Sequence, residues 1–338
     1  MESRGERWFA GESDFETDLP TLWGDWGLDS EVGRLRSVLL RRPGPEIEDV
    51  DPGRARWLER MDPERARRQH DRLAAIYREA GAEVHYVEGD VGPRPNALFV
   101  RDLVAMTPEG AILARPAMEA RRGEEVAVAR TLTSLGVPII RTISGRGVFE
   151  GADLMWVDRR TVIIGLGNRS NRDAARQIEE VLRPLGVEHF LPFAVPYGQA
   201  HIDGLFNLAD RDLACFFPWQ TPFELVDFLR RRGFRLVEVS SPEEAKMGMA
   251  TNFVCLEPGR VVMPAGNPGT RGALEAAGVE VVELDVSELQ KGWGSIHCMT
   301  APLAREPLCG CALSGRGRRS PDRTHYPLCG GGRRIIDE

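Results

Sequence analysis

An amphipathic helix, a glycine and a short β-rich strand follow one another repeatedly along the chain. The helical segments carry apolar residues at helical spacing, as at Ile178, Val181, Leu182 and Leu185. Glycine most easily adopts the left-handed backbone that ends a helix, so a glycine after each segment predicts a helix C-terminus. The five glycines, spaced 45 to 55 residues apart, are Gly81, Gly136, Gly186, Gly233 and Gly278.

Pairs of β-rich runs separated by tight turns lie between these units. Residues 103–115, 154–166 and 253–265 each predict a strand hairpin, so the repeat is strand, strand, helix, strand. Five such units cannot each bury an apolar face alone, and we expect them to share one centre. The sequence therefore predicts an α/β fold of five ββαβ units closed into a propeller. The main alternative is one open, doubly wound sheet, whose plain βαβ repeat lacks the hairpin.

Both ends of the chain fall outside the repeat. Residues 1–33 contain Trp8, Trp23 and Trp26 among acidic residues and glycines, and we expect an N-terminal arm packed over the body. Residues 34–304 are the predicted catalytic propeller. Residues 305–338 are rich in Gly, Arg, Ser, Pro and Cys without periodicity, which predicts a disordered tail.

Composition narrows the class of partner. Of 338 residues, 42% are hydrophobic and 28% charged, which is ordinary for a soluble globular protein. The net charge of −7 argues against nucleic acid or an anionic membrane as the main partner. No apolar run approaches the roughly 20 residues of a membrane span. Six scattered cysteines fit a reducing cytoplasm, so we expect a cytoplasmic protein that binds a small molecule. A homo-oligomer is compatible with the sequence.

Charged and nucleophilic residues interrupt segments that otherwise have the pattern of buried strands. They fall in four different repeats, and in a ring the strand ends of all repeats converge on one axis. Because isolated burial of a charge is costly, we expect these side chains to share one polar pocket. The residues are Asp102, Glu150, Asp153, His201, Asp203, His297 and Cys298.

Several carboxylates in one pocket require a cation. A metal is disfavoured because the ligand types are mixed and no CxxC or HExxH spacing is present; Cys309, Cys311 and Cys329 also lack a convincing fourth ligand. A guanidinium fits better, because its planar fork of N–H donors matches two carboxylates. The thiolate of Cys298 could attack its central carbon. We therefore expect neither a metal nor a cofactor.

Five segments resemble the guanidino-group-modifying enzymes of the pentein fold, which include arginine deiminases, dimethylarginine hydrolases, agmatine deiminases and amidinotransferases. The resemblance covers about residues 33 to 303 and implies a five-unit ββαβ propeller, in agreement with the repeat count. The segments are FVRD (99–102), FEGAD (149–153), GLGNRSN (165–171), HIDGLFN (201–207) and GSIHCMT (294–300).

The resemblance implies a role for each matching residue. Cys298 would be the nucleophile. His201 would protonate the departing amine and then act as base for water, and Glu150 would contact both His201 and the substrate. Asp102 and Asp203 would clamp the guanidinium nitrogens.

Three arginines and one further acid are assigned to the substrate in the same way. Arg169 matches an arginine that grips the α-carboxylate. Arg121 and Arg122, in EARRGEE (119–125), resemble a deiminase stretch with a similar task, and the resemblance does not choose between them. For Asp153, capping a turn and binding substrate remain open alternatives.

The expected activity is cysteine-dependent hydrolysis of a guanidino compound, first of all free L-arginine, through an S-amidino-type intermediate on Cys298. The product would be citrulline, or ornithine after a second hydrolysis. The alternative is an amidinotransferase that passes the amidino group to an amine. EGAD (150–153) favours the deiminases, whereas the segment before Cys298 lacks the arginine of many arginine deiminases. A non-enzymatic pentein-fold binding protein would have no need of Cys298, His201 and Glu150.

Overall fold

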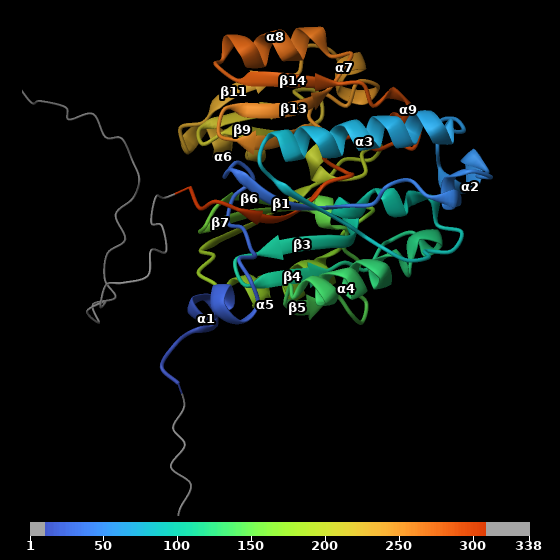
Figure 1. Ribbon diagram of the computed structural model, residues 1–338. Coiled ribbons are helices and arrows are strands. Elements are labelled where there is room, and N and C mark those ends of the chain that lie inside the picture. Colours follow the sequence, from blue (N-terminus) through green and yellow to red (C-terminus); the bar gives the residue numbers. More distant parts are fainter. Residues whose placement is uncertain (1–10, 309–338) are drawn as a thin grey trace, which may run out of the picture.

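The computed structural model describes residues 11–308, which form a mixed α/β fold with five small sheets (Figure 1). Each sheet has three strands, in the orders β15-β1-β2, β3-β4-β5, β6-β7-β8, β9-β10-β11 and β12-β13-β14. The strands are β1 (Leu35–Leu40), β2 (Glu83–Tyr86), β3 (Val104–Thr107), β4 (Gly110–Leu113), β5 (Ile139–Thr142), β6 (Leu154–Asp158), β7 (Thr161–Leu166), β8 (His189–Ala194), β9 (Phe206–Asp210), β10 (Leu213–Phe216), β11 (Arg235–Glu238), β12 (Val254–Glu257), β13 (Arg260–Pro264), β14 (Glu280–Leu284) and β15 (Ala301–Arg305).

All five sheets have the same connectivity. The central strand pairs antiparallel with one neighbour and parallel with the other, and a helix joins the parallel pair. In Figure 1, α8 lies above β14 at the top of the view, and α4 lies beside β4 and β5 near the bottom. The joining helices are α3 (Pro63–Glu79), α4 (Glu124–Leu135), α5 (Arg172–Leu182), α6 (Phe223–Arg231) and α8 (Pro268–Ala276); the others are α1 (Phe15–Leu22), α2 (Pro52–Ala55), α7 (Pro242–Lys246) and α9 (Ser287–Gln290).

Four of the five predicted helix-ending glycines, Gly81, Gly136, Gly233 and Gly278, lie within two residues of the last residue of their helix, whereas Gly186 lies four residues after α5 ends. All five have a left-handed backbone, with φ between 80° and 96°, and a strand follows each of them. The three predicted hairpins are also present, as β3–β4, β6–β7 and β12–β13. A fourth hairpin, β9–β10, turns at Arg211-Asp212 and was not predicted. Its turn lacks glycine and proline, as does the turn of the predicted hairpin β6–β7.

One sheet joins the two ends of the described chain. β15 pairs antiparallel with β1, and Leu39 lies opposite Ala301. Arg305, the first residue of the predicted tail, is buried within β15, and residues 309–338 lie outside the described residues. Of the predicted arm, residues 1–10 also lie outside them; Glu31 is buried in an ion pair of 2.9 Å with Arg101.

A short segment lies directly before the first strand of each sheet. We call these five the pre-strand segments: η3 (Val100–Leu103), η5 (Gly151–Asp153) with Glu150, η6 (Ile202–Gly204) with His201, residues 250–253 and residues 295–300. The other 3-10 helices are η1 (Pro45–Ile47), η2 (Pro95–Leu98) and η4 (Glu119–Arg121). Among the described helices, none has the length and apolar character needed to cross a bilayer.

Candidate active site

The pre-strand segments touch one another in sequence order. Gly151 lies so close to η3 that a Cβ atom there would be 2.4 Å from the carbonyl oxygens of Arg101 and Val104, which explains a glycine at this position. The next contact is a hydrogen bond of 3.0 Å from the Ile202 amide to Asp153 Oδ1. Asp153 also accepts from Ser170, so its placement is that of an acid that holds the loop before His201.

The remaining contacts close the series. Asn252 Nδ2 lies 3.3 Å from Asp203 Oδ2, and Asn252 Oδ1 accepts the His297 amide at 2.9 Å. The amide of Arg101 donates to the Cys298 carbonyl at 3.0 Å, which links the last segment to the first. The polar residues of five different sheets are therefore held together by short contacts.

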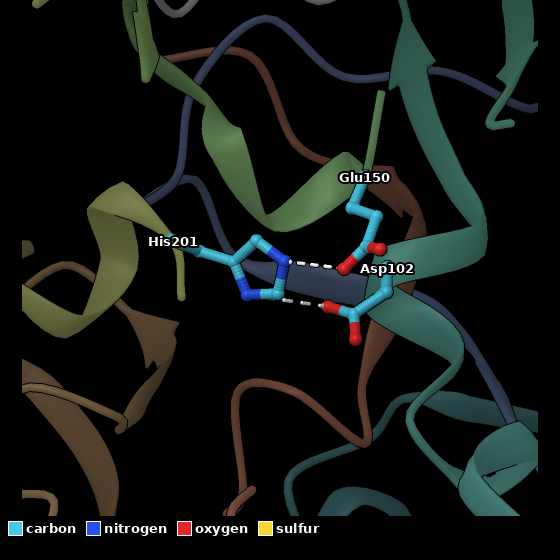
Figure 2. A group of neighbouring side chains, drawn as sticks. All are labelled: Asp102, Glu150 and His201. Atoms are coloured by element: carbon cyan, nitrogen blue, oxygen red, sulfur yellow. Dashed lines mark hydrogen bonds and ion pairs between the residues drawn. The ribbon is translucent and has the colours of Figure 1, made fainter. Parts of the chain in front are cut away.

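Asp102, Glu150 and His201 form the first cluster of this site. All three are buried, and Figure 2 shows both carboxylates directed toward the imidazole. His201 Nε2 lies 2.7 Å from Glu150 Oε2, and Nδ1 lies 3.8 Å from Asp102 Oδ1. Burial opposes the charge on the ring, yet Asp102, Glu150 and Asp153 together raise the pKa of His201 to about 10. The imidazole is therefore protonated at neutral pH.

Arg121 lies behind these two carboxylates. Its Nη1 is 2.5 Å from Asp102 Oδ2 and 3.6 Å from Glu150 Oε2, and it also pairs with Glu124 at 2.9 Å. Burial disfavours its charge, but these three acids raise the pKa of Arg121. Asp102 Oδ1 is left buried without a hydrogen bond from any described residue. An acceptor in this state is suited to a donor from a bound ligand.

The other two predicted arginines lie toward the surface. Arg169 Nη1 donates to Glu150 Oε2 at 3.0 Å, and its side chain is 20% exposed. Arg122 is exposed, and its Nε donates to the Pro116 carbonyl at 3.3 Å. The neighbouring Ala117 amide donates to Glu150 Oε1, so Arg122 is anchored beside the same carboxylate without contacting it.

The thiol of Cys298 lies in the second cluster. Its Sγ is 3.1 Å from Asn252 Nδ2 and 3.9 Å from Asp203 Oδ2, and the residue is buried. Burial, followed by the negative charges of Asp203 and Asp102, raises the pKa of the Cys298 thiol well above its usual range. A bound cation would relieve this repulsion and favour the thiolate.

Asp203 is kept ionised by its neighbours. Burial alone would protonate it, but the hydrogen bond of 2.8 Å from His297 Nδ1 lowers the pKa of the Asp203 carboxyl, and the charge of His201 acts in the same direction. Asp102 and Asp203 are thus two carboxylates near the sulfur.

A metal ion is the other cation to consider. One ligand atom each from Asp102, Glu150 and His201 lies within 4.8 Å of the others. However, the imidazole carries a proton, and Arg121 and Arg169 already pair with the two carboxylates. These residues therefore do not fit a metal, whose ligands must be free of protons.

The structure thus brings most of the predicted residues together. Asp102, Asp153, Glu150, His201 and Asp203 lie in contacting segments with Cys298, whereas Arg122 and Arg169 lie at the margin. Sequence reasoning missed Asn252, the only pre-strand residue of its sheet that contacts the thiol among the described residues. The available signal was its place: Asn252 lies two residues before the first strand of a hairpin, as Asp102 does.

Several proteins that resemble this chain in sequence or fold have names that describe enzymes of guanidino compounds. The chain is 28% identical to the N(G),N(G)-dimethylarginine dimethylaminohydrolase of Pseudomonas aeruginosa, over 79% of this chain and 98% of the relative. It is 23% identical to the arginine deiminase of Rhodococcus erythropolis, over 83% and 98%. The N-terminal domain of ArgZ, a cyanobacterial arginine dihydrolase, superposes with a TM-score of 0.70 at 21% identity, over 80% of this chain and 98% of that one.

Together, these relatives place the protein among the guanidino-group-modifying enzymes of the pentein superfamily. A model of one family within it, N,N dimethylarginine dimethylhydrolase (eukaryotic), matches residues 56–305. The chain belongs to this family.

Proposed function

We propose that the protein is a cysteine-dependent hydrolase of L-arginine that releases citrulline and ammonia. The observation that carries this proposal is the pair of carboxylates beside the thiol: Asp203 Oδ2 lies 3.9 Å from Cys298 Sγ, and Asp102 Oδ1 is buried without a hydrogen-bond partner among the described residues. A guanidinium bound between them satisfies both acids and brings its central carbon to the sulfur.

The same pair of acids favours an unmethylated guanidinium. Each terminal nitrogen of arginine carries two hydrogens and can donate to a carboxylate. In the proposed arrangement each acid binds one terminal nitrogen. A dimethylated terminal nitrogen has no hydrogen, so it would place methyl groups against one of the two acids and leave that charge without a donor. We therefore assign free arginine, and not dimethylarginine, as the preferred substrate.

The proposed reaction proceeds in two steps. The cation lowers the pKa of Cys298, the thiol loses its proton to solvent, and the thiolate attacks the central carbon to give a neutral tetrahedral adduct. His201 gives its proton to one terminal nitrogen, ammonia leaves, and an S-alkylthiouronium remains on Cys298. Neutral His201 then takes a proton from water, whose oxygen attacks the same carbon. The adduct expels the thiolate, which takes up the hydroxyl proton of the adduct as the ureido carbonyl forms. The thiol proton released to solvent in the first step converts the departed ammonia to ammonium.

The geometry assigns the proton to one nitrogen of His201. Nε2 is held by Glu150 at 2.7 Å, while Nδ1 has no closer partner among the described residues than Asp102 Oδ1 at 3.8 Å. We propose that Nδ1 delivers the proton, while Glu150 orients the ring and stabilises its charge.

Product identification tests this proposal. The full chain is incubated separately with L-arginine, agmatine, monomethylarginine and asymmetric dimethylarginine, with and without glycine, and products are identified by mass spectrometry. We expect citrulline and ammonia from arginine without an acceptor, at a higher kcat/KM than for dimethylarginine. Product formed only with glycine, carrying the amidino group, would instead show a transferase. Ornithine with two ammonia molecules would show double hydrolysis, and preference for dimethylarginine would contradict the substrate assignment.

For the α-carboxylate of arginine we propose Arg122 together with Arg169, and not Arg121. The guanidinium of Arg121 is buried against Asp102, Glu124 and Glu150, and it could reach a substrate only by leaving them uncompensated. Arg122 is exposed and contacts only a main-chain carbonyl with its Nε atom.

Arg122→Ala is therefore expected to reduce kcat/KM for arginine mainly through KM. Loss of one hydrogen-bonded charge pair corresponds to roughly a tenfold to hundredfold change. Agmatine, which lacks the carboxylate, is the internal control and should lose much less. Equal losses for both substrates would contradict the assignment.

We further propose that the five sheets are the blades of a propeller with pseudo-fivefold symmetry. The shared ββαβ connectivity, the closing pair β15–β1 and the continuous contacts between pre-strand segments support this arrangement. In it, the site lies where the five segments meet.

A further inference from the structure

Asn252 lies in the pre-strand segment of the sheet β12-β13-β14, the one sheet for which no catalytic residue was predicted. The other four sheets supply an acid, the histidine or the cysteine at this position. Asn252 is 5% exposed, and its side-chain amide faces both the thiol and a carboxylate of the site. Because of these contacts, we expect Asn252 to act within the site.

The orientation of the Asn252 amide follows from its partners. Oδ1 accepts the main-chain amides of His297 at 2.9 Å and Cys298 at 3.3 Å. Main-chain N–H groups only donate, so the oxygen must face them and the NH₂ group must face the other side. On that side lie Cys298 Sγ at 3.1 Å and Asp203 Oδ2 at 3.3 Å.

The backbone around Asn252 is fixed by another asparagine. Asn207, the last residue of the HIDGLFN segment, is buried and donates from Nδ2 to the carbonyls of Thr251 at 2.9 Å and Phe253 at 2.8 Å. These carbonyls flank Asn252 on both sides. A further hydrogen bond of 2.8 Å, from the main-chain N–H of Asn252 to the Met249 carbonyl, closes the preceding turn. The side chain therefore projects from a backbone held at several points.

We infer that Asn252 holds the Cys298 sulfur beside Asp203 and stabilises the thiolate by donating a hydrogen bond to it, with Asn207 fixing the backbone from which it does so. This inference rests on the proposed function, because it concerns the same nucleophile. The oxygen of this side-chain amide thereby fixes the main chain of Cys298. Its nitrogen fixes the positions of the sulfur and of Asp203, the acid that faces the substrate.

The charged groups around the thiol show why a neutral donor matters there. Asp203 and Asp102 both raise the pKa of the Cys298 thiol. His297 and His201 lower the pKa of Asp203 and so keep this carboxylate charged beside the sulfur. The Asn252 hydrogen bond lowers the pKa of the thiol and so opposes the two acids. It does this without adding a positive charge that would repel a cationic substrate.

Two variants separate this role from simple packing. Asn252→Asp keeps the acceptor oxygen for the two main-chain amides but loses the donor and adds a negative charge. Asn252→Ser keeps a polar group that is too short to reach the sulfur. Asn171→Asp is the matched control. It likewise removes an amide donor, here to the Arg146 carbonyl at 2.9 Å, and keeps an oxygen that caps α5, but it lies outside the pre-strand segments. The readout is the rate of iodoacetamide alkylation of Cys298 against pH, followed on its peptide by mass spectrometry.

We expect both Asn252 variants to shift the alkylation profile to higher pH and to lower the rate at pH 8 by roughly tenfold or more. The shift should be larger for Asn252→Asp than for Asn252→Ser. Asn171→Asp should match the parent. Variants with the parent's melting temperature and an unchanged profile would overturn the inference, and so would a collapse of the melting temperature in both. Alkylation needs no substrate, so this failure is distinct from inactivity of the parent on guanidino compounds, which would refute the proposed function.

Discussion

Cys298→Ser should abolish turnover of L-arginine, with a loss on the order of 10⁴-fold or more, while the fold persists. A serine hydroxyl at this position is a far weaker nucleophile, because its proton is held much more firmly than that of a thiol. The carboxylates that surround it, Asp102 and Asp203, raise the cost of an oxygen anion further. Steady-state citrulline formation and thermal unfolding of the variant check both parts.

The matched control is Cys255→Ser. Cys255 is buried in β12, and its Sγ lies 3.0 Å from the Glu257 carbonyl, where a hydroxyl can donate equally well. This variant should retain the parent's activity. If Cys298→Ser kept the parent's turnover, as Cys255→Ser is expected to do, Cys298 would not be the nucleophile.

His201→Gln should lower kcat by about 10²- to 10⁴-fold, the usual contribution of a positioned acid or base. Glutamine can preserve a hydrogen bond to Glu150 but cannot deliver a proton to the departing nitrogen or accept one from water. Because the surrounding acids raise the pKa of His201, the parent imidazole is protonated at neutral pH, and activity should fall only as alkaline pH removes this proton. Initial rates between pH 6 and 11 measure both effects.

His189→Gln provides the comparison for that experiment. His189 begins β8 and is exposed, so its replacement should leave both kcat and the pH profile unchanged. If His201→Gln kept the parent's kcat, or if its alkaline limb coincided with that of the parent, His201 would not be the proton donor.

The local fold was readable from the sequence because it depends on local chemistry. The five glycines after the helices, and Gly110 and Gly259 in two of the predicted hairpin turns, adopt a positive φ that other residues rarely take, so their pattern can be recognised in a single sequence. The pairing of β15 with β1 was not readable, since nothing local links residues 301–305 to residues 35–40. The buried pair of Glu31 with Arg101 was missed for the same reason.

The site was predictable where an unusual residue interrupts an apolar strand. Asp102, His201 and Cys298 carry that signal, and their charge or reactivity demands an explanation in a buried segment. Asn252 is uncharged and Arg121 lies between other charged residues, so neither stands out. Choosing between Arg121 and Arg122 required knowing which guanidinium is buried, and adjacent residues on a chain differ in that respect only through tertiary structure.

The central claim is that the sulfur of Cys298 bonds to the guanidinium carbon of the substrate. The most direct measurement is acid quenching of the parent during turnover of L-arginine, followed by mass analysis of the peptide that contains Cys298. The account predicts an adduct with the mass of arginine less ammonia on that peptide. Citrulline formation with Cys298 unmodified at every quench time, or with the adduct on another residue, would contradict it.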